Sequence, residues 1–259
     1  MIIIKIQGGL SNQLFQFSLY KMFEHSGYEV YLDNSFFETQ SLRKFELSNF
    51  TNIKYKLYDK TDNALFEQIG DDFNYKDFSS LRDDKNYLLN GYWQSEKYFI
   101  HIQDIIRKEL SPEPSLIFDL LEDYDIDMLS ESVSLHIRRG DYVNQQQNHP
   151  LQDISYYEKA LGILEGKYKH ILVFSDDIIW CRENLKFDNM IFVDGNRNID
   201  DIYLMSMCKN NIICNSSFSW WGAWLNTNPE KIVISPNKWF GTSLNLNTSD
   251  IIPKEWIKI

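Results

Sequence analysis

The chain has 259 residues, 43% of them hydrophobic and 15% aromatic, which suffices for one large domain or two small ones and excludes global disorder. Its net charge of −11 argues against a broad nucleic-acid surface and against an anionic membrane as a strong partner. The sequence has no signal peptide and no apolar run of about 18 residues, and its three cysteines lack disulfide or zinc-site spacing. We therefore expect a cytoplasmic protein with reduced thiols and at most peripheral membrane association.

The beginning of the chain has the pattern of a strand, a turn, a helix and a second strand. Residues 2–6 are apolar and predict a buried strand, which Gly8 and Gly9 follow in a turn. Apolar residues at helical spacing predict a helix ending near Gly27, and residues 28–33 predict the next strand. This order is typical of a doubly wound α/β sheet. The two glycines alone are a weak dinucleotide-binding signal, and a tight turn is the better interpretation.

The remainder of the first half is less regular. Residues 35–85 are polar and aromatic and predict no clear element, as in either substrate-binding loops or surface insertions. Residues 87–94 predict a strand running into a turn, and Ser95 fits the cap of a following helix. Trp93 in this turn fits either an exposed residue that stacks on a sugar or a core residue.

The two halves are separated by a Pro-containing segment. Residues 110–115 predict a linker, so we place an N-terminal domain at 1–115 and a C-terminal domain at 116–259. A helix over 116–128 is expected to connect them, and Ser155 has the capping-box spacing that opens a later helix. Short apolar, β-branched runs alternate with helical stretches and predict parallel βα units, with strands at 170–174, 190–193, 211–214 and 231–234.

The second half begins with a strand that ends in charged residues, Val133 to Tyr142. Arg138 and Arg139 stand where the strand stops, and ligands of open α/β sheets bind beyond the carboxyl ends of the strands. A guanidinium group matches phosphate oxygens in a bidentate manner, so we interpret this turn as a pyrophosphate site rather than an ion-paired surface turn. Because neighbours on a strand point oppositely, the two arginines need not be equivalent, and Arg139 is the candidate to brace Asp141 or the turn.

Two further strand ends carry polar residues. Asp176 and Asp177 follow one strand and fit metal ligands, contacts to ligand hydroxyls or helix caps, with capping the default for at least one of them. Ser216 and Ser217 precede another helix, whose start offers N–H groups and the positive end of its dipole to a phosphate.

Five stretches resemble the inverting bacterial α-1,2-fucosyltransferases of glycosyltransferase family 11. They are Gly8–Gln16, Gly91–Phe99, His136–Tyr142 in the pattern His-x-Arg-Arg-Gly-Asp-Tyr, and the segments Phe174–Cys181 and Cys214–Leu225. The resemblance implies an α/β GT-B fold, in which two Rossmann-like domains face a cleft. It also implies inverting transfer of fucose from GDP-fucose to a galactose 2-hydroxyl of a glycan, without a metal or other cofactor. The missing membrane anchor favours a bacterial enzyme over a Golgi one.

The resemblance also assigns roles to residues. It makes Arg138 the clamp on the β-phosphate, Asp201 the partner of the guanine edge, and Asn12 and Gln13 candidates for contacts to the sugar or acceptor. The other donor-site candidates follow the same motifs: His136, Arg139, Asp176, Ser216, Ser217 and Phe218.

The catalytic base and the exact activity stay open at this level. Asp141 is the leading base candidate, with His149 and Glu96 as alternatives. Acceptor recognition is expected within residues 35–100. Two other functions compete with this one. The chain could be another nucleotide-sugar transferase of the same fold, or a glycan-binding module, which its seven tryptophans suggest.

Overall fold

The computed structural model describes residues 1–39, 42–59 and 64–259, and the chain forms two compact units. The first contains Met1–Ser111 together with Asn247–Pro253, and the second contains Pro112–Leu246 together with Lys254–Ile259. The division after Ser111 falls inside the predicted linker. The return of residues 247–253 to the first unit has no counterpart in the sequence-based boundary at residue 115.

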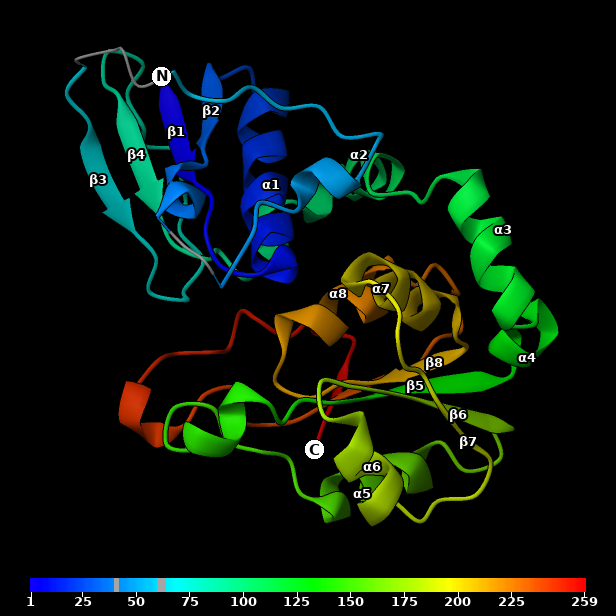
Figure 1. The fold of residues 1–259 in the computed structure, drawn as a ribbon. Helices are drawn as coiled ribbons and strands as arrows, with labels where there is room; N and C mark the ends of the chain where they lie inside the picture. The colour runs from blue at the N-terminus through cyan, green and yellow to red at the C-terminus, as the bar shows by residue number, and fades with distance from the viewer. Residues whose placement is uncertain (40–41, 60–63) are drawn as a thin grey trace. The chain divides into compact units, whose positions relative to one another are not determined.

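The first unit is built on a four-stranded parallel sheet with the order β2-β1-β4-β3 (Figure 1). Its strands are β1 (Ile2–Lys5), β2 (Val30–Asp33), β3 (Glu67–Gly70) and β4 (Tyr87–Asn90), and helix α1 (Leu10–His25) connects β1 to β2. The predicted strand, helix and strand at the start of the chain are therefore confirmed. Gly27 follows α1 with a φ of 84°, a conformation that favours glycine. Edge strand β3 lies in the region for which the sequence predicted no element.

The remaining elements of the first unit are short. They are the 3₁₀ turns Ser35–Glu38, Leu47–Asn49, Glu96–Tyr98 and Ile100–Ile102 and helix α2 (Gln103–Glu109). Ser95 does act as a cap, since its Oγ accepts from the Lys97 N–H, but the segment it opens starts as 3₁₀ turns rather than an α-helix. Trp93 is 1% exposed and packs against Phe78 and Tyr98, so the core interpretation is right and exposed stacking on a sugar is wrong.

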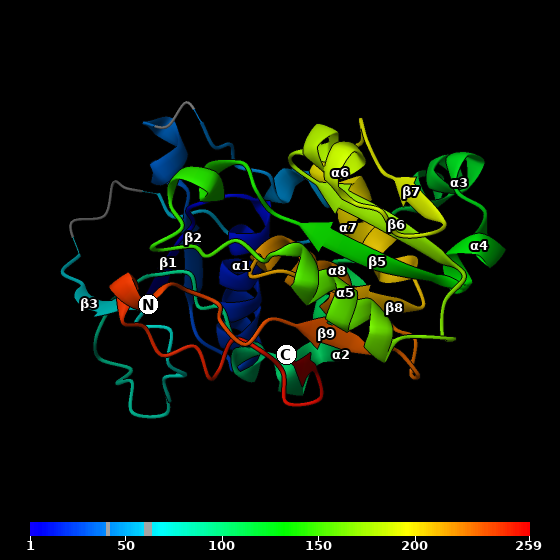
Figure 2. The same ribbon diagram turned by 90° about the horizontal axis from the view of Figure 1, so that it is seen from below.

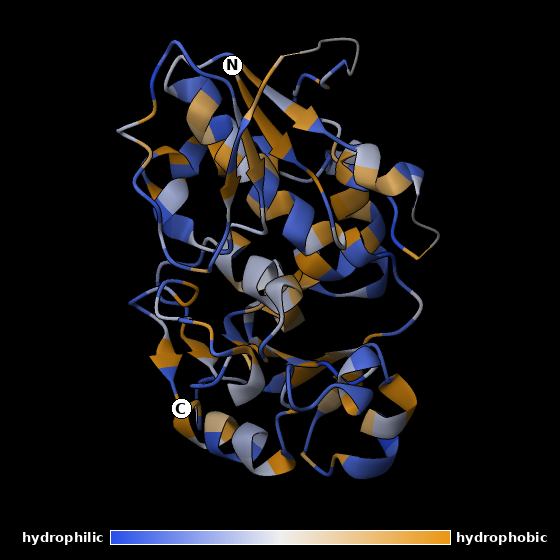
Figure 3. Cartoon of the chain, turned by 90° about the vertical axis from the view of Figure 1, so that its left-hand side faces the viewer, coloured by the Kyte–Doolittle hydropathy of each residue, from blue (hydrophilic) through white to orange (hydrophobic). Residues whose placement is uncertain are grey.

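The second unit contains a six-stranded parallel sheet with the order β10-β9-β8-β5-β6-β7, seen from below in Figure 2. Its strands are β5 (Ser132–Ile137), β6 (His170–Ser175), β7 (Met190–Phe192), β8 (Asn210–Ile212), β9 (Val233–Ser235) and β10 (Ile257–Lys258). The predicted parallel βα units are confirmed, with strand ends that differ by one or two residues. Every residue of β5 is buried, because a sheet covered on both faces has no solvated side. Figure 3 shows the hydrophobic residues of the chain, in orange, within its strands and helices.

Helices cover both faces of this sheet. Helices α7 (Asn198–Met207) and α8 (Ser217–Leu225) lie on one face, and α5 (Ile154–Ile163) and α6 (Ile178–Asn184) lie on the other (Figure 1). The expected single helix 116–128 is instead α3 (Pro114–Asp123) and α4 (Ile126–Ser130), because Asp125 caps a new helix. Asp153, not Ser155, caps α5 by accepting from the Tyr156 N–H. The 3₁₀ turns Asp141–Asn144 and Thr242–Leu244 complete the unit.

The core of the second unit is rich in tryptophan. Trp220, Trp221 and Trp224 of α8 are buried against one another, and Trp256 packs on Trp220. Packing roles predicted for Trp221 and Trp224 are thus confirmed. The three cysteines are unpaired and buried. In the described part of the chain, no helix has both the length and the apolar character needed to cross a membrane.

Candidate functional site

The site forms where the central strands of the second sheet end. Strand β5 pairs with β8 on one side and β6 on the other, and all three run in the same direction. Arg138 and Arg139 follow the last residue of β5, Asp176 and Asp177 follow β6, and Ser216 lies between β8 and α8. Three predicted polar stretches therefore meet at one edge of the sheet, as expected for the carboxyl ends of parallel strands.

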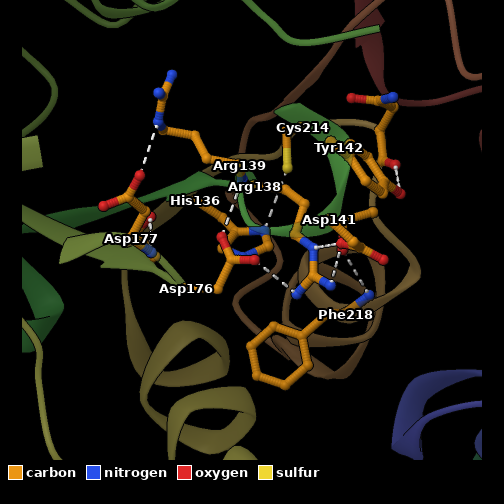
Figure 4. Close-up of polar contacts among 12 residues, drawn as sticks. His136, Arg138, Arg139, Asp141, Tyr142, Asp176, Asp177, Cys214 and Phe218 are labelled. Carbon is orange, nitrogen blue, oxygen red and sulfur yellow. Dashed lines mark hydrogen bonds and ion pairs between the residues drawn. The ribbon is translucent and has the colours of Figure 1, made fainter. Parts of the chain in front are cut away.

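Arg138 is held between two carboxylates (Figure 4). Its Nε and Nη2 donate to one oxygen of Asp141 at 3.2 and 2.6 Å, and its Nη1 lies 3.1 Å from Asp176 Oδ2. Burial disfavours the charged guanidinium, but the two carboxylates outweigh it and raise the pKa of Arg138. The side chain is 26% exposed, so the fixed cation remains accessible to a ligand. Asp141 thus braces Arg138, and the suggestion that it braces Arg139 is wrong.

Arg139 points away from Arg138, as predicted for neighbours on a strand (Figure 4). Its Nε donates to Asp177 Oδ2 at 3.1 Å, and its guanidinium lies 3.8 Å from the centre of the Trp180 ring. Asp177 also caps α6, because its Oδ1 accepts from the Trp180 N–H. Capping is therefore confirmed for one of the two adjacent acids, and Arg139 is fixed on the α6 side of the strand end.

Asp176 ties the arginine turn to the end of β6. Its Oδ1 accepts from the Arg139 backbone N–H at 2.9 Å while its Oδ2 pairs with Arg138. A Cβ on Gly140 would lie 2.2 Å from Asp176 Oδ2, so only glycine lets the turn approach this carboxylate. Asp176 contributes to the site by orienting both arginines.

His136 lies in the site but behind its surface. It is buried, its Nδ1 is 3.3 Å from Cys214 Sγ, and its ring packs on that of Phe218. Burial, reinforced by the Arg138 charge, lowers its pKa to about 3, so the imidazole is neutral at physiological pH. His136 and Phe218 therefore pack on each other behind the arginine turn.

The start of α8 provides the second anion-binding feature. Ser216 is the N-cap, with its Oγ accepting from the Phe218 N–H at 3.3 Å, and Ser217 is the first helical residue. The first turn of α8 contains no acidic residue that would oppose an anion. Its N–H groups and helix dipole favour a negative charge at this end.

Asp201 lies in the first turn of α7, beyond the end of β7. The capping role there belongs to Asp200, which accepts from the backbone and side chain of Arg197. Asp201 instead accepts from Asn196 Nδ2 at 3.1 Å. Burial raises its pKa to about 6, the Asn196 bond opposes this, and Asp200 and Asp194 add to it. A carboxylate whose ionised form is disfavoured by burial fits a ligand contact better than a structural cap.

The two residues of the first unit that are candidates for sugar or acceptor contacts differ in whether a ligand can reach them. Gln13 is fully buried, donates to the Gly8 and Lys44 carbonyls and accepts from the Glu46 N–H, so its amide organises this loop. Asn12 is only partly buried, and its Oδ1 accepts from Gln94 Nε2 at 2.7 Å. Of this pair, Asn12 is the residue that a ligand can reach.

The candidate bases also differ. Asp141 uses one oxygen for Arg138, and its other oxygen has no hydrogen bond among the described residues. The Asp141 side chain is 44% exposed. His149 lies in the same unit against Tyr142, whereas Glu96 belongs to the first unit. Over residues 1–39, 42–59 and 64–259, no three His, Cys, Asp or Glu side chains are grouped as metal ligands would be.

Comparison with known families matches the model described as "Glycosyl transferase family 11" over residues 1–259. The chain belongs to glycosyltransferase family 11. An alpha-1,2-colitosyltransferase of Escherichia coli is 31% identical, covering all of this chain and 99% of that protein. A galactoside alpha-(1,2)-fucosyltransferase 2 of Rattus norvegicus is 32% identical over 37% of this chain and 30% of its own length. The chain is therefore a glycosyltransferase.

Solved structures of fucosyltransferases share the fold of this family member. The NodZ alpha-1,6-fucosyltransferase soaked with GDP-fucose matches with a TM-score of 0.53 and 13% identity, covering 86% of this chain and 92% of that one. POFUT1 in complex with GDP matches with a TM-score of 0.50 and 11% identity, covering 90% and 97%. These likenesses and the two parallel sheets establish the predicted α/β GT-B fold class.

Two residues of the site were not singled out from the sequence of this family member. Tyr142 donates through its hydroxyl to the Asn215 carbonyl at 3.1 Å, and Asn215 immediately precedes the cap of α8. Both residues lie inside the stretches that carry the family resemblance. Their membership in those stretches was the available signal, but the contact between them depends on the fold.

Proposed function

We propose that this glycosyltransferase transfers L-fucose from GDP-fucose to the 2-hydroxyl of a galactose residue in a glycan, with inversion at the anomeric carbon. The observation that carries the proposal is Arg138, an accessible cation fixed at the end of β5 beside the start of α8. This arrangement suits the two negatively charged groups of a nucleoside diphosphate, and the family and fold relatives include fucosyltransferases.

The donor would be bound by three features of the second unit. Arg138 pairs with the β-phosphate, the Ser216 cap and Ser217 present the helix start to the same diphosphate, and Asp201 accepts from N1 and N2 of guanine. Preorganised positive groups stabilise the charge that develops on departing GDP, which is the role a metal plays in other transferases. We therefore propose that the reaction needs no metal.

Asp141 would act on both the donor and the acceptor of the reaction. The oxygen bonded to Arg138 keeps the clamp in place, and the second oxygen of this partly exposed side chain is available to accept a proton. The acceptor 2-hydroxyl attacks the anomeric carbon opposite the bond to GDP, its proton passes to Asp141, and the bonding electrons leave with GDP. A late proton transfer fits the oxocarbenium character of such a transition state.

Colitose transfer is the second candidate, because the colitosyltransferase resembles this chain over its whole length. Colitose is fucose without the 3-hydroxyl, so the two donors differ by a single oxygen. A site that hydrogen-bonds a substrate hydroxyl rejects the analogue without it far more strongly than an apolar site rejects an added hydroxyl.

The deciding experiment compares kcat/KM for GDP-fucose, GDP-colitose, GDP-mannose and UDP-galactose on a panel of galactosides, with the product linkage determined by NMR. We expect GDP-fucose to be preferred and the new bond to be α-1,2. Preference for GDP-colitose would establish the second candidate. A bond to another hydroxyl would refute the linkage, and a flat calorimetric titration with GDP would leave a glycan-binding module.

A further inference from the structure

Tyr142 contacts three separate parts of the second unit. The Arg138 guanidinium lies 5.6 Å from the centre of its ring, within the range of a cation–π interaction. Its ring also stacks on His149, with centroids 4.7 Å apart and planes inclined by 18°. Its hydroxyl donates to the Asn215 carbonyl. The Tyr142 side chain thus joins Arg138, the proposed phosphate ligand, to the segment that precedes α8.

Asn215 makes that junction rigid. It is 2% exposed, its Nδ2 donates to the Trp239 carbonyl at 3.0 Å, and its Oδ1 accepts from Gln152 Nε2 at 3.2 Å. The residue after it is the Ser216 cap. A hydrogen bond to Asn215 therefore fixes Tyr142 relative to the N–H groups at the start of α8.

His149, which stacks on Tyr142, is itself anchored. Its backbone N–H donates to the Gln145 carbonyl at 2.8 Å, and its ring packs against Phe240 with centroids 5.6 Å apart. The Gly241 N–H donates to the Asn148 carbonyl at 2.8 Å, and a Cβ on Gly241 would lie 1.9 Å from the Gln147 carbonyl oxygen. The loop that carries His149 is thus closed against residues 240–243.

The imidazole of His149 acts as a flat surface in this arrangement. Its Nδ1 is buried and, within the described residues, has no hydrogen-bond partner. Burial lowers the pKa of His149, Asp141 opposes this, and Arg138 adds to it, so the surroundings favour the neutral ring. A stack of this kind depends on the shape of the ring rather than on its nitrogens.

We propose that Tyr142 and His149 are positioning residues that hold Arg138 at a fixed place relative to the start of α8. A diphosphate then meets the guanidinium and the helix N–H groups together, without ordering either on binding. This inference rests on the proposed GDP-linked donor. It assigns His149 to positioning and removes it from the candidate bases.

The test measures the affinities of GDP and guanosine by calorimetry, with kcat and thermal unfolding, for matched variants. Tyr142→Leu removes the ring and the hydroxyl, and we expect it to weaken GDP by roughly tenfold or more while guanosine affinity stays within about twofold. Tyr142→Phe keeps the ring and should have a smaller effect. His149→Phe keeps the stack and should resemble the wild type, whereas His149→Ala should weaken GDP roughly tenfold. Tyr168→Leu, at the opposite edge of the sheet before β6, controls for the loss of a tyrosine.

Each outcome decides the question. Unchanged GDP affinity in Tyr142→Leu, or equal losses for GDP and guanosine, would overturn the positioning role. A His149→Phe enzyme that binds GDP normally but has lost kcat like His149→Ala would show that the imidazole nitrogens take part in the chemistry. If the wild-type protein bound no GDP, the proposed function itself would fail, and this inference with it.

Discussion

Replacing Asp201 with asparagine should stabilise the protein and weaken nucleotide binding at the same time. Burial raises the pKa of this carboxyl from 3.8 to about 6. One pKa unit corresponds to about 1.4 kcal/mol, so the ionised group lowers the free energy of unfolding by up to about 3 kcal/mol. The amide avoids this penalty, and its oxygen can still accept from Asn196.

The pH dependence follows from the sign of the shift. Because the pKa is higher in the folded state, the carboxyl favours folding below about pH 3.8, and that contribution is lost as the pH rises through 6. The stability difference between the Asp201→Asn variant and the wild type should therefore be largest above pH 6 and vanish near pH 4. Urea unfolding followed by tryptophan fluorescence suits this measurement, since six of the seven tryptophans lie in the second unit.

The Asp201→Asn variant should be more stable than the wild type but should bind GDP more weakly. A charge-assisted contact to guanine contributes about 1–3 kcal/mol, so GDP should bind roughly 5- to 150-fold more weakly to the variant. The wild-type preference for GDP over inosine diphosphate, which lacks the 2-amino group, should shrink in parallel. Asp200→Asn is the control, because it disturbs the cap of α7 and should reduce stability without this selectivity change. Lower stability of Asp201→Asn at pH 7 with unchanged GDP affinity would refute the reasoning and make Asp201 structural.

Three further outcomes are expected. Arg138→Lys should nearly abolish turnover, because an ammonium cannot reproduce a bidentate fork. The control Arg182→Lys on α6 should leave turnover unchanged. A folded, fully active Arg138→Lys enzyme would contradict the role of Arg138 as the phosphate ligand. Activity assayed in EDTA should persist, and loss restored by Mg²⁺ or Mn²⁺ would reassign Asp176 and Asp177. Asp141→Asn should lower kcat by ~10²–10⁴-fold with GDP affinity nearly intact. If calorimetry shows GDP affinity falling in step with kcat, Asp141 only organises Arg138.

The strands of the site could be predicted because apolar, mostly β-branched residues recur through each short run and polar residues follow it. The run from Val133 to Ile137 ends abruptly at two arginines, and this change locates the carboxyl end of β5. By contrast, β3 has mostly exposed residues and no apolar alternation, since its pairing with β4 depends on backbone hydrogen bonds. The sequence pattern of β3 therefore does not indicate that it pairs with β4.

Contacts between distant segments were the part that could not be predicted. The partner of Asp141 was misjudged because the 3₁₀ turn after Gly140 folds Asp141 back onto Arg138. The capping error at α5 has a similar cause: Asp153 and Ser155 both have the right chemistry, and only the start of the helix decides between them. The burial of Trp93 likewise depends on Phe78, fifteen positions earlier and in a region without predicted elements.

The return of residues 247–253 to the first unit has a consequence for the order of folding during synthesis. Asp250 accepts from the Tyr75 N–H and pairs with Lys97, and Asn247 donates to Asn74, so this segment completes the packing of the N-terminal unit. Domains generally fold in order as they leave the ribosome. Here the N-terminal unit emerges first but cannot reach its final form until the whole second sheet except β10 has been translated. Neither unit can therefore mature much before the other.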